Sequence, residues 1–195
     1  MSKIDFNALR DRAYKCACEH GFHGTELSNG HLMMLVITEL SEAVEADRKG
    51  KYFKGISTFE REFNRYYALV DENKCFERAF EKYVKDTVPD EMADAVIRLL
   101  DLAGSIDISL DDIYDLTNEP KYKDWDDALK EMSFTERMFF LTSILTNDGD
   151  IAEVIKASIV IIFLNADLLY IDLLWHIEQK QKYNELRPYR HEKKY

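Results

Sequence analysis

Two segments of the chain carry carboxylates three residues apart within patterns that are otherwise typical of buried amphipathic helices. Glu39 and Glu42 form the first pair, and Glu91 and Asp94 form the second. Side chains at this spacing lie on the same face of a helix. Two such helices facing each other would gather four carboxylates in one small volume, where their mutual repulsion requires a bound cation. Oxygen ligands suit a hard ion such as Mg²⁺ or Mn²⁺, so the sequence predicts a metal site and phosphate chemistry.

The composition favours an all-α protein. Only three prolines and seven glycines interrupt 195 residues, and 46% of the residues are hydrophobic. A chain of this length can bury a substantial core, and a low content of helix breakers favours long helices. We therefore expect a single all-α domain over residues 1–195.

The helix that carries the first acidic pair has clear start and stop signals. Ser28 or Asn29 is suited to cap its N-terminus. Gly50 follows Lys49, the last residue expected in the helix. The pair should then lie beside or within the apolar stripe of this helix.

The second acidic pair follows a more charged segment. Residues 51–86 are expected to form an insertion of one or two helices. Pro89 suits the first turn of the next helix, with Asp86 or Thr87 near the cap. Gly104 is expected to end that helix.

The second half of the chain predicts further helices at about 134–146, 151–169 and 172–186. Comparison of the two halves suggests an internally duplicated helical hairpin, with an acid-bearing half at about 1–118 and a degenerate half at about 130–195. In this alignment the second copy has lost the metal ligands and serves as scaffold. Two apolar hairpins packed together would form a four-helix core, a common place for carboxylate metal sites.

Charge and cysteine content limit the classes of binding partner and indicate the cellular compartment. The formal net charge of −11 would repel nucleic acid and anionic membranes, so we expect no duplex nucleic acid as partner. The most apolar run, 151–174, contains charged residues, so it is expected to be a buried helix and not a membrane span. The cysteines Cys16, Cys18 and Cys75 include no CxxC pair and follow no signal peptide. They predict reduced thiols in a cytoplasmic protein.

Three histidines near a glycine-containing turn, His20, His23 and His31, raise the question of a zinc site. No cysteine completes a zinc-binding spacing beside them, so we expect loop or partly exposed histidines. The acidic run 124–127 lacks the glycine and closing glutamate of a calcium loop and is expected to be a helix cap or exposed turn.

Three aromatic residues are candidates for stacking on a nucleobase: Phe22, Trp125 and Trp175. An aromatic residue in a helical protein more often belongs to the core. We therefore expect these three side chains to pack in the interior.

Taken together, the two acidic pairs and the C-terminal run from Lys180 to Tyr195 resemble the MazG-like all-α nucleotide pyrophosphohydrolases, a superfamily that includes the dimeric dUTPases. Residues 37–51 are similar to the first acidic helix of the family, and residues 90–103 are similar to the second. The resemblance implies hydrolysis of a nucleoside triphosphate between its α and β phosphates, which yields a monophosphate and pyrophosphate. It also implies a homodimer.

The resemblance implies roles for single residues. Glu39, Glu42, Glu91 and Asp94 would hold one or more Mg²⁺ ions, and Mn²⁺ would also suit these ligands. Such cations neutralise the triphosphate, polarise the phosphorus and lower the pKa of a bound water. Either Glu39 or Glu42 would orient or deprotonate that water. The residues that would contact the nucleotide or its phosphates are Lys180, Asn184, Arg187 and Lys194.

The chain departs from the family pattern in three places. Thr38 stands where the family often has a further glutamate, the insertion at 52–86 is longer than in compact members, and the segment 110–134 is extra. These differences concern the substrate pocket and the oligomeric state more than the metal site.

Two other functions stay open: a dUTPase-like enzyme restricted to deoxyuridine nucleotides, and a non-catalytic helical interaction protein that retains the fold.

Overall fold

The computed structural model describes residues 4–65, 67, 70–113 and 120–189. Within these ranges the chain forms helices and no strand, which confirms the predicted all-α class. In chain order the helices are α1 (Phe6–Glu19), α2 (Asn29–Arg48), α3 (Ile56–Asn64), α4 (Glu72–Tyr83), α5 (Val88–Ser105), α7 (Pro120–Lys130), α8 (Phe134–Leu145), α9 (Ile151–Leu168) and α10 (Leu173–Leu186).

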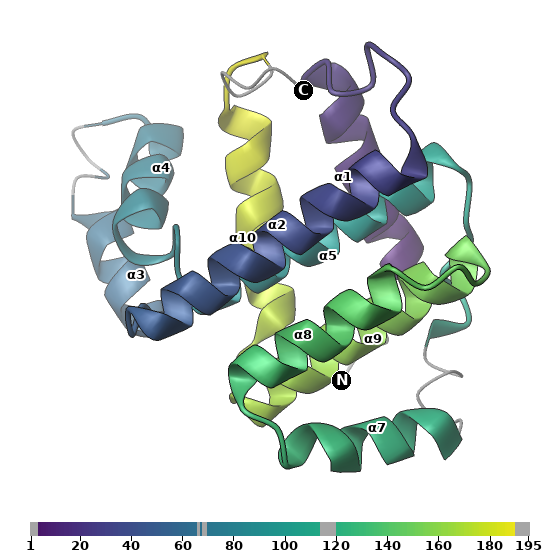
Figure 1. The fold of residues 1–195 in the computed structure, drawn as a ribbon. Coiled ribbons are helices and arrows are strands. Elements are labelled where there is room, and N and C mark those ends of the chain that lie inside the picture. Colours follow the sequence, from purple (N-terminus) through teal and green to yellow (C-terminus); the bar gives the residue numbers. More distant parts are fainter. Residues whose placement is uncertain (1–3, 66, 68–69, 114–119, 190–195) are drawn as a thin grey trace.

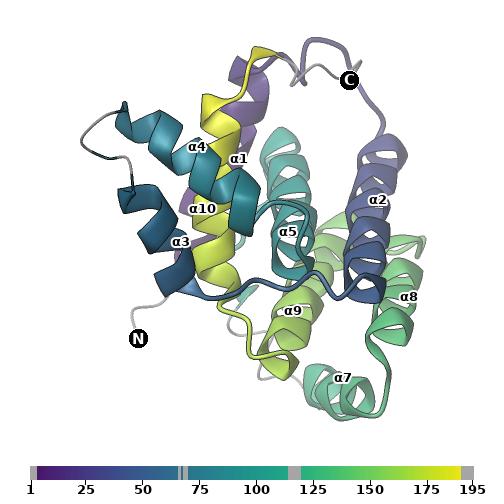
Figure 2. The ribbon, with the colours of Figure 1, turned by 90° about the vertical axis from the view of Figure 1, so that its left-hand side faces the viewer.

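Helix α5 lies at the centre of the fold. It packs against α1, α2, α9 and α10, and Figures 1 and 2 show it running between α2 on one side and α10 on the other. Most of its residues are buried, including both its aliphatic residues and several acidic ones. Every polar group that α5 carries toward a neighbouring helix therefore lies in or near the core.

Helices α2, α5, α8 and α9 pack together as two pairs, and a core of the MazG-like type stays a prediction. Helix α2 packs against α5 and α8, and α9 packs against α5 and α8. One hydrophobic cluster runs through all four helices, and Figure 1 shows the α8–α9 pair lying alongside the α2–α5 pair. The internal duplication stays a prediction.

The boundaries of α2 confirm the predicted signals. The Ser28 hydroxyl accepts a hydrogen bond from the backbone N–H of His31 at 3.2 Å, which satisfies one of the unpaired donors at the helix start. The helix ends at Arg48, and Gly50 adopts a left-handed conformation with φ of 64°. Glycine adopts this conformation without a steric penalty, so the chain can leave the helix there.

Gly104 does not end α5 as predicted, because the helix continues to Ser105. A Cβ atom at this position would lie 2.6 Å from the Cβ atom of Tyr14 on α1. The glycine therefore permits the close packing of α1 on α5. The position of Gly104 in the sequence resembles a helix stop signal, but the structural reason for a glycine here is the contact with Tyr14.

The described residues of the insertion at 51–86 form two helices, α3 and α4, which is one of the two arrangements expected. Their aromatic residues Phe59, Phe76 and Phe80 form a second hydrophobic cluster with Tyr183 of α10. Trp175 packs against the same cluster. Figure 2 shows α3 and α4 lying on the side of α10 that faces away from α9. The insertion thus covers α10 without entering the four-helix core.

The acidic run at 124–127 lies inside α7, which contradicts the expectation of a cap or turn. Lys130 follows one turn later and binds Asp126 at 2.7 Å and Asp127 at 3.0 Å. These i,i+3 and i,i+4 ion pairs offset the charge of the acidic run within the helix. Trp125 packs against Tyr122 and the Phe140 ring of α8, as expected for a core aromatic.

Two further expectations concern the membrane and the cysteines. Among the described helices, none has by itself both the length and the apolar composition to cross a bilayer. Helix α9, which forms the most apolar run, is largely buried in the core. Cys16, Cys18 and Cys75 form no disulfide bond.

Candidate metal centre

Three of the four predicted metal ligands meet between α2 and α5. Glu39 of α2 and Glu91 and Asp94 of α5 each offer one carboxylate oxygen, and these three oxygens lie within 4.8 Å of one another. The Glu39 and Glu91 residues are only 7% and 4% exposed, and Asp94 is half-buried. Helices α2 and α5 therefore face each other through their acidic stripes, as the spacing of the pairs predicts.

Glu42, the fourth predicted ligand, is exposed and does not belong to this group of three. It lies one turn along α2 from Glu39, and its charge raises the pKa of both Glu39 and Glu91. The side chain is therefore close to the cluster, but on its solvent side.

The environment of Glu39 and Glu91 disfavours their ionised forms. Burial, followed by repulsion from Asp94, raises the pKa of Glu91 to about 8. Burial and the charge of Asp94 also raise the pKa of Glu39, although the nearby Arg98 opposes this rise. A divalent cation at this position would reverse the effect, because it favours the charged carboxylates.

A buried lysine from α10 already neutralises part of this acidic region. The Lys180 ammonium lies 2.7 Å from Asp94 Oδ2 and 2.9 Å from Asp90 Oδ2. Burial opposes its charge, but the two carboxylates outweigh burial and raise the pKa of Lys180. For Asp90, which is fully buried, burial outweighs the attraction of Lys180 and raises the pKa to about 6.

The donor set fits a hard divalent cation. It consists of carboxylate oxygens, the ligands that Mg²⁺ and Mn²⁺ prefer. Asp90 Oδ1 is buried beside the cluster and has no hydrogen-bond partner among the described residues. With Glu39, Asp90, Glu91 and Asp94 ionised, and Lys180 and Arg98 charged, four negative charges face two positive ones. One divalent cation would neutralise the two remaining negative charges.

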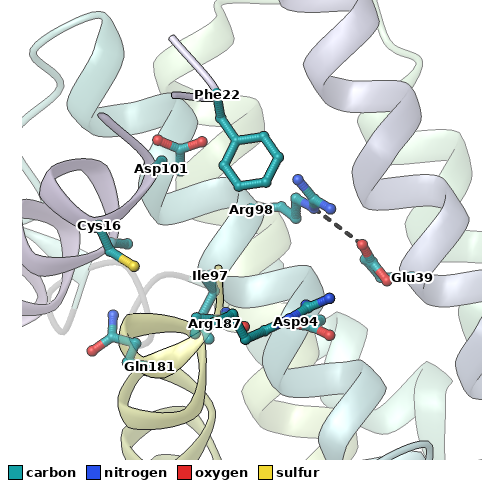
Figure 3. Close-up of a pocket in the computed structure, with 12 residues that line it drawn as sticks. Cys16, Phe22, Glu39, Asp94, Ile97, Arg98, Asp101, Gln181 and Arg187 are labelled. Carbon is teal, nitrogen blue, oxygen red and sulfur yellow. Dashed lines mark hydrogen bonds and ion pairs between the residues drawn. The ribbon is translucent and has the colours of Figure 1, made fainter. Parts of the chain in front are cut away.

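The carboxylate cluster borders a cavity of about 80 Å³ between α1, α2, α5 and α10. Figure 3 shows Glu39 and Asp94 on one side of this cavity and Cys16 and Gln181 on the opposite side. The Arg98 guanidinium donates through Nε to Glu39 Oε1 at 3.0 Å. A ligand in the cavity would therefore touch both the acidic cluster and fixed positive charge.

The predicted nucleotide-binding residues do not all reach this cavity. Asn184 and Arg187 line it, whereas Lys180 does not and is instead engaged by Asp90 and Asp94. Lys194 lies outside the described residues. The roles of all four in substrate binding stay predictions.

A second cavity, of about 210 Å³, opens on the other side of the cluster. Its lining includes Glu42 and Glu91 together with Lys49 and Lys51 from the end of α2 and the residues that follow. The acidic cluster therefore lies between two cavities, each with basic residues in its wall.

The histidines take no part in the cluster. His20 is buried, which differs from expectation, and its Nε2 lies 2.9 Å from the carbonyl oxygen of Arg187. His23 Nε2 lies 2.7 Å from Asp101 Oδ1, and this hydrogen bond raises the pKa of His23. Phe22, expected in the core, lines the cavity instead.

Sequence reasoning missed Asp90, Arg98 and Asp101 as parts of the site. Together with Asp94 they follow a spacing of four, four and three residues along α5, which is one polar stripe on a helix that is otherwise buried. This periodicity was the signal that could have identified them. The lysine that balances Asp90 comes from α10 and is 90 residues away in sequence.

Comparisons of this chain with family models, with curated proteins and with solved structures find nothing that matches it. The resemblance to the MazG-like enzymes therefore stays an expectation, and the function is argued from the site alone.

Proposed function

We propose that this protein is a divalent-cation-dependent nucleotide pyrophosphohydrolase that cleaves an NTP or dNTP to its monophosphate and pyrophosphate. One observation carries the proposal: the oxygens of Glu39, Glu91 and Asp94 lie within 4.8 Å of one another, and Glu39 and Asp94 line a cavity that also contains arginines. Carboxylates and arginines side by side suit a substrate that is bound through both metal ions and phosphates.

In this proposal Glu39, Glu91 and Asp94 hold Mg²⁺. When bound, the cation neutralises phosphate charge and makes a water molecule more acidic. Glu42 lies on the solvent side of the cluster, where it can orient or deprotonate the attacking water. This arrangement favours Glu42 over Glu39 as the base, because an oxygen of Glu39 is already bound by Arg98.

Arg98 and Arg187 supply the positive charge that a triphosphate requires. The Nε atom of Arg98 is used by Glu39, and its two terminal amino groups have no partner among the described residues. Arginine binds phosphate through several donors at once, and these two residues come from different helix regions that border the same cavity. Lys49 and Lys51 offer further charge on the other side of the cluster.

The test incubates purified protein with each common NTP and dNTP, including dUTP, in Mg²⁺ and resolves the products by chromatography. We expect monophosphate and pyrophosphate from the wild type and none from Glu91→Gln. Glu178→Gln is the matched control, because Glu178 is an exposed glutamate on α10 away from the cluster. Cleavage of dUTP alone would favour the dUTPase-like alternative.

Metal binding is measured separately by titrating Mn²⁺ into the protein in a calorimeter. We expect binding in the wild type and in Glu178→Gln, and a large loss in Glu91→Gln. Intact triphosphates together with no Mn²⁺ binding would contradict the proposal and favour a non-catalytic helical interaction protein.

Association into a homodimer and residence in the cytoplasm stay predictions. Light scattering at working concentration tests the first, and a monomer would contradict it.

A further inference from the structure

The cavity beside the metal centre is lined by a further acidic residue that the proposed reaction does not use. Asp101 lies on α5 seven residues after Asp94 and lines the same cavity. A rise of 1.5 Å per residue places the two positions about 10 Å apart along the helix, on the same face. The cavity is thus bordered by a carboxylate at each end of this stretch of α5.

Asp101 is positioned by the neighbouring loop. It is only 8% exposed, and its Oδ1 is held by His23 Nε2 at 2.7 Å. The other oxygen, Oδ2, has no hydrogen-bond partner among the described residues. A carboxylate oxygen can only accept hydrogen bonds, so this end of the cavity selects a ligand that donates one.

The remaining walls suit a flat ring. Phe22 comes from the loop after α1, and Figure 3 shows its ring beside Asp101, above Ile97 of α5. Aromatic and aliphatic side chains of this kind pack against the faces of a base. At about 80 Å³ the cavity is smaller than the cavity of about 150 Å³ that holds benzene, so a single ring enters it only in part and two fused rings fit less well.

We infer that Asp101 is the base-reading residue of this site and that it selects a pyrimidine with an exocyclic amine, the pattern of cytosine. The inference rests on the proposed function, because it places the phosphates of the substrate at the Glu39 and Asp94 end of the cavity. The base then reaches Asp101, whose Oδ2 accepts a hydrogen bond from the amine. Uracil presents a carbonyl oxygen at the same position, and the carboxylate repels it.

The test measures equilibrium binding of CMP, UMP and AMP in Mg²⁺ by calorimetry, so that it does not depend on hydrolysis. We expect CMP to bind at least about tenfold more tightly than UMP, because a correct hydrogen-bonded pair discriminates by roughly this factor or more. AMP should also bind more weakly than CMP, because of its second ring. The N4,N4-dimethyl derivative of CMP, which lacks the donor, should lose the preference in the unmodified protein.

Asp101→Asn provides the complementary change in the protein. The asparagine oxygen can still face His23 while its amide nitrogen donates toward the base, so the preference should shift from CMP toward UMP. Asp107→Asn is the matched control, because Asp107 is exposed just beyond α5 and asparagine tolerates its φ of 55° equally well. Binding of tripolyphosphate, which has no base, should be the same in all three proteins.

The outcomes separate this inference from the proposed function. Equal binding of CMP and UMP, equal binding of CMP and AMP, or an unchanged preference in Asp101→Asn would overturn the inference, even if triphosphates are hydrolysed. A preference for CMP that Asp101→Asn reverses would support it, even if no triphosphate is hydrolysed and the proposed reaction fails.

Discussion

The ammonium of Lys180 and the carboxylate of Asp90 form an ion pair of 2.9 Å whose side chains are only 7% and 1% exposed. The pair joins α10 to α5 at the point where α5 begins to carry the acidic cluster. An ion pair that is removed from water depends on both partners, because either charge alone is strongly disfavoured in the interior.

Replacing Lys180 with methionine should destabilise the protein by about 3–5 kcal/mol at pH 8, because Asp90 loses its counter-charge. The double variant Lys180→Met, Asp90→Asn should recover part of this loss, since it removes both charges. Urea denaturation of the three proteins measures the free energies of unfolding. Equal stability of the single and double variants would show that the buried charge of Asp90 is not the cause.

The destabilisation by Lys180→Met should also depend on pH. Burial raises the pKa of Asp90 to about 6 even with Lys180 present, and removal of the lysine raises it further. At pH 5 the folded variant therefore keeps Asp90 protonated at little cost in free energy. At pH 8 it must either bury the charged carboxylate or keep Asp90 protonated at a pH that favours loss of the proton, and both reduce the stability. The loss should be smaller at pH 5 than at pH 8, as repeated urea denaturation at both values would measure.

Without metal, the stability of the wild type should fall as the pH rises from 6.5 to 8. Burial raises the pKa of Glu91 to about 8, so in this window the folded state binds more protons than the unfolded state, and unfolding becomes easier with increasing pH. The window starts at 6.5 because burial lowers the pKa of His176 to about 4, which gives the opposite slope at lower pH. Thermal melts in EDTA test the slope, which should be shallower in Glu91→Gln.

Added metal should reverse this trend. Mg²⁺ or Mn²⁺ favours the ionised form of Glu91 and binds the folded state, so it should raise the melting temperature of the wild type, more at pH 8 than at pH 6.5. Glu91→Gln should show a much smaller rise, and the surface variant Glu178→Gln should respond like the wild type. A metal-induced rise of equal size in Glu91→Gln would place the cation elsewhere.

Gly104→Ala should destabilise the protein by about 1–3 kcal/mol, because the new Cβ atom would lie 2.6 Å from Tyr14 Cβ and force α1 away from α5. Gly30→Ala, in the first turn of α2, is the control. Its added Cβ atom meets nothing closer than 4.0 Å, so the substitution should be neutral or stabilising. Chemical denaturation of both variants distinguishes a packing effect from a general effect of helical glycine.

The sequence was sufficient for the parts of the fold that depend on local signals. Ser28 and Gly50 bound α2 as predicted, because capping and left-handed conformations are properties of a few neighbouring residues. The pairing of α2 with α5 also followed from their acidic and apolar stripes. Gly104 was misread because its role depends on Tyr14, which lies on another helix.

The site was predictable in its ligands and less so in its surroundings. Glu39, Glu91 and Asp94 meet as expected, but nothing local indicates that Glu42 faces solvent or that Lys180 turns toward Asp90. These features depend on how α10 and the loop after α1 lie against α5. A buried lysine and its distant aspartate are adjacent only in the folded chain.

The stripe along α5 also limits how the sequence can change. Asp94 and Asp101 share a face because seven residues, close to two turns of the helix, separate them. A substitution at either position leaves the other in place, so the proposed metal ligand and the proposed base-reading residue can vary independently. Insertion or loss of a single residue between them would rotate one relative to the other by about 100°. In α5, therefore, a substitution preserves the shared face of the two positions, whereas an insertion or a deletion between them does not.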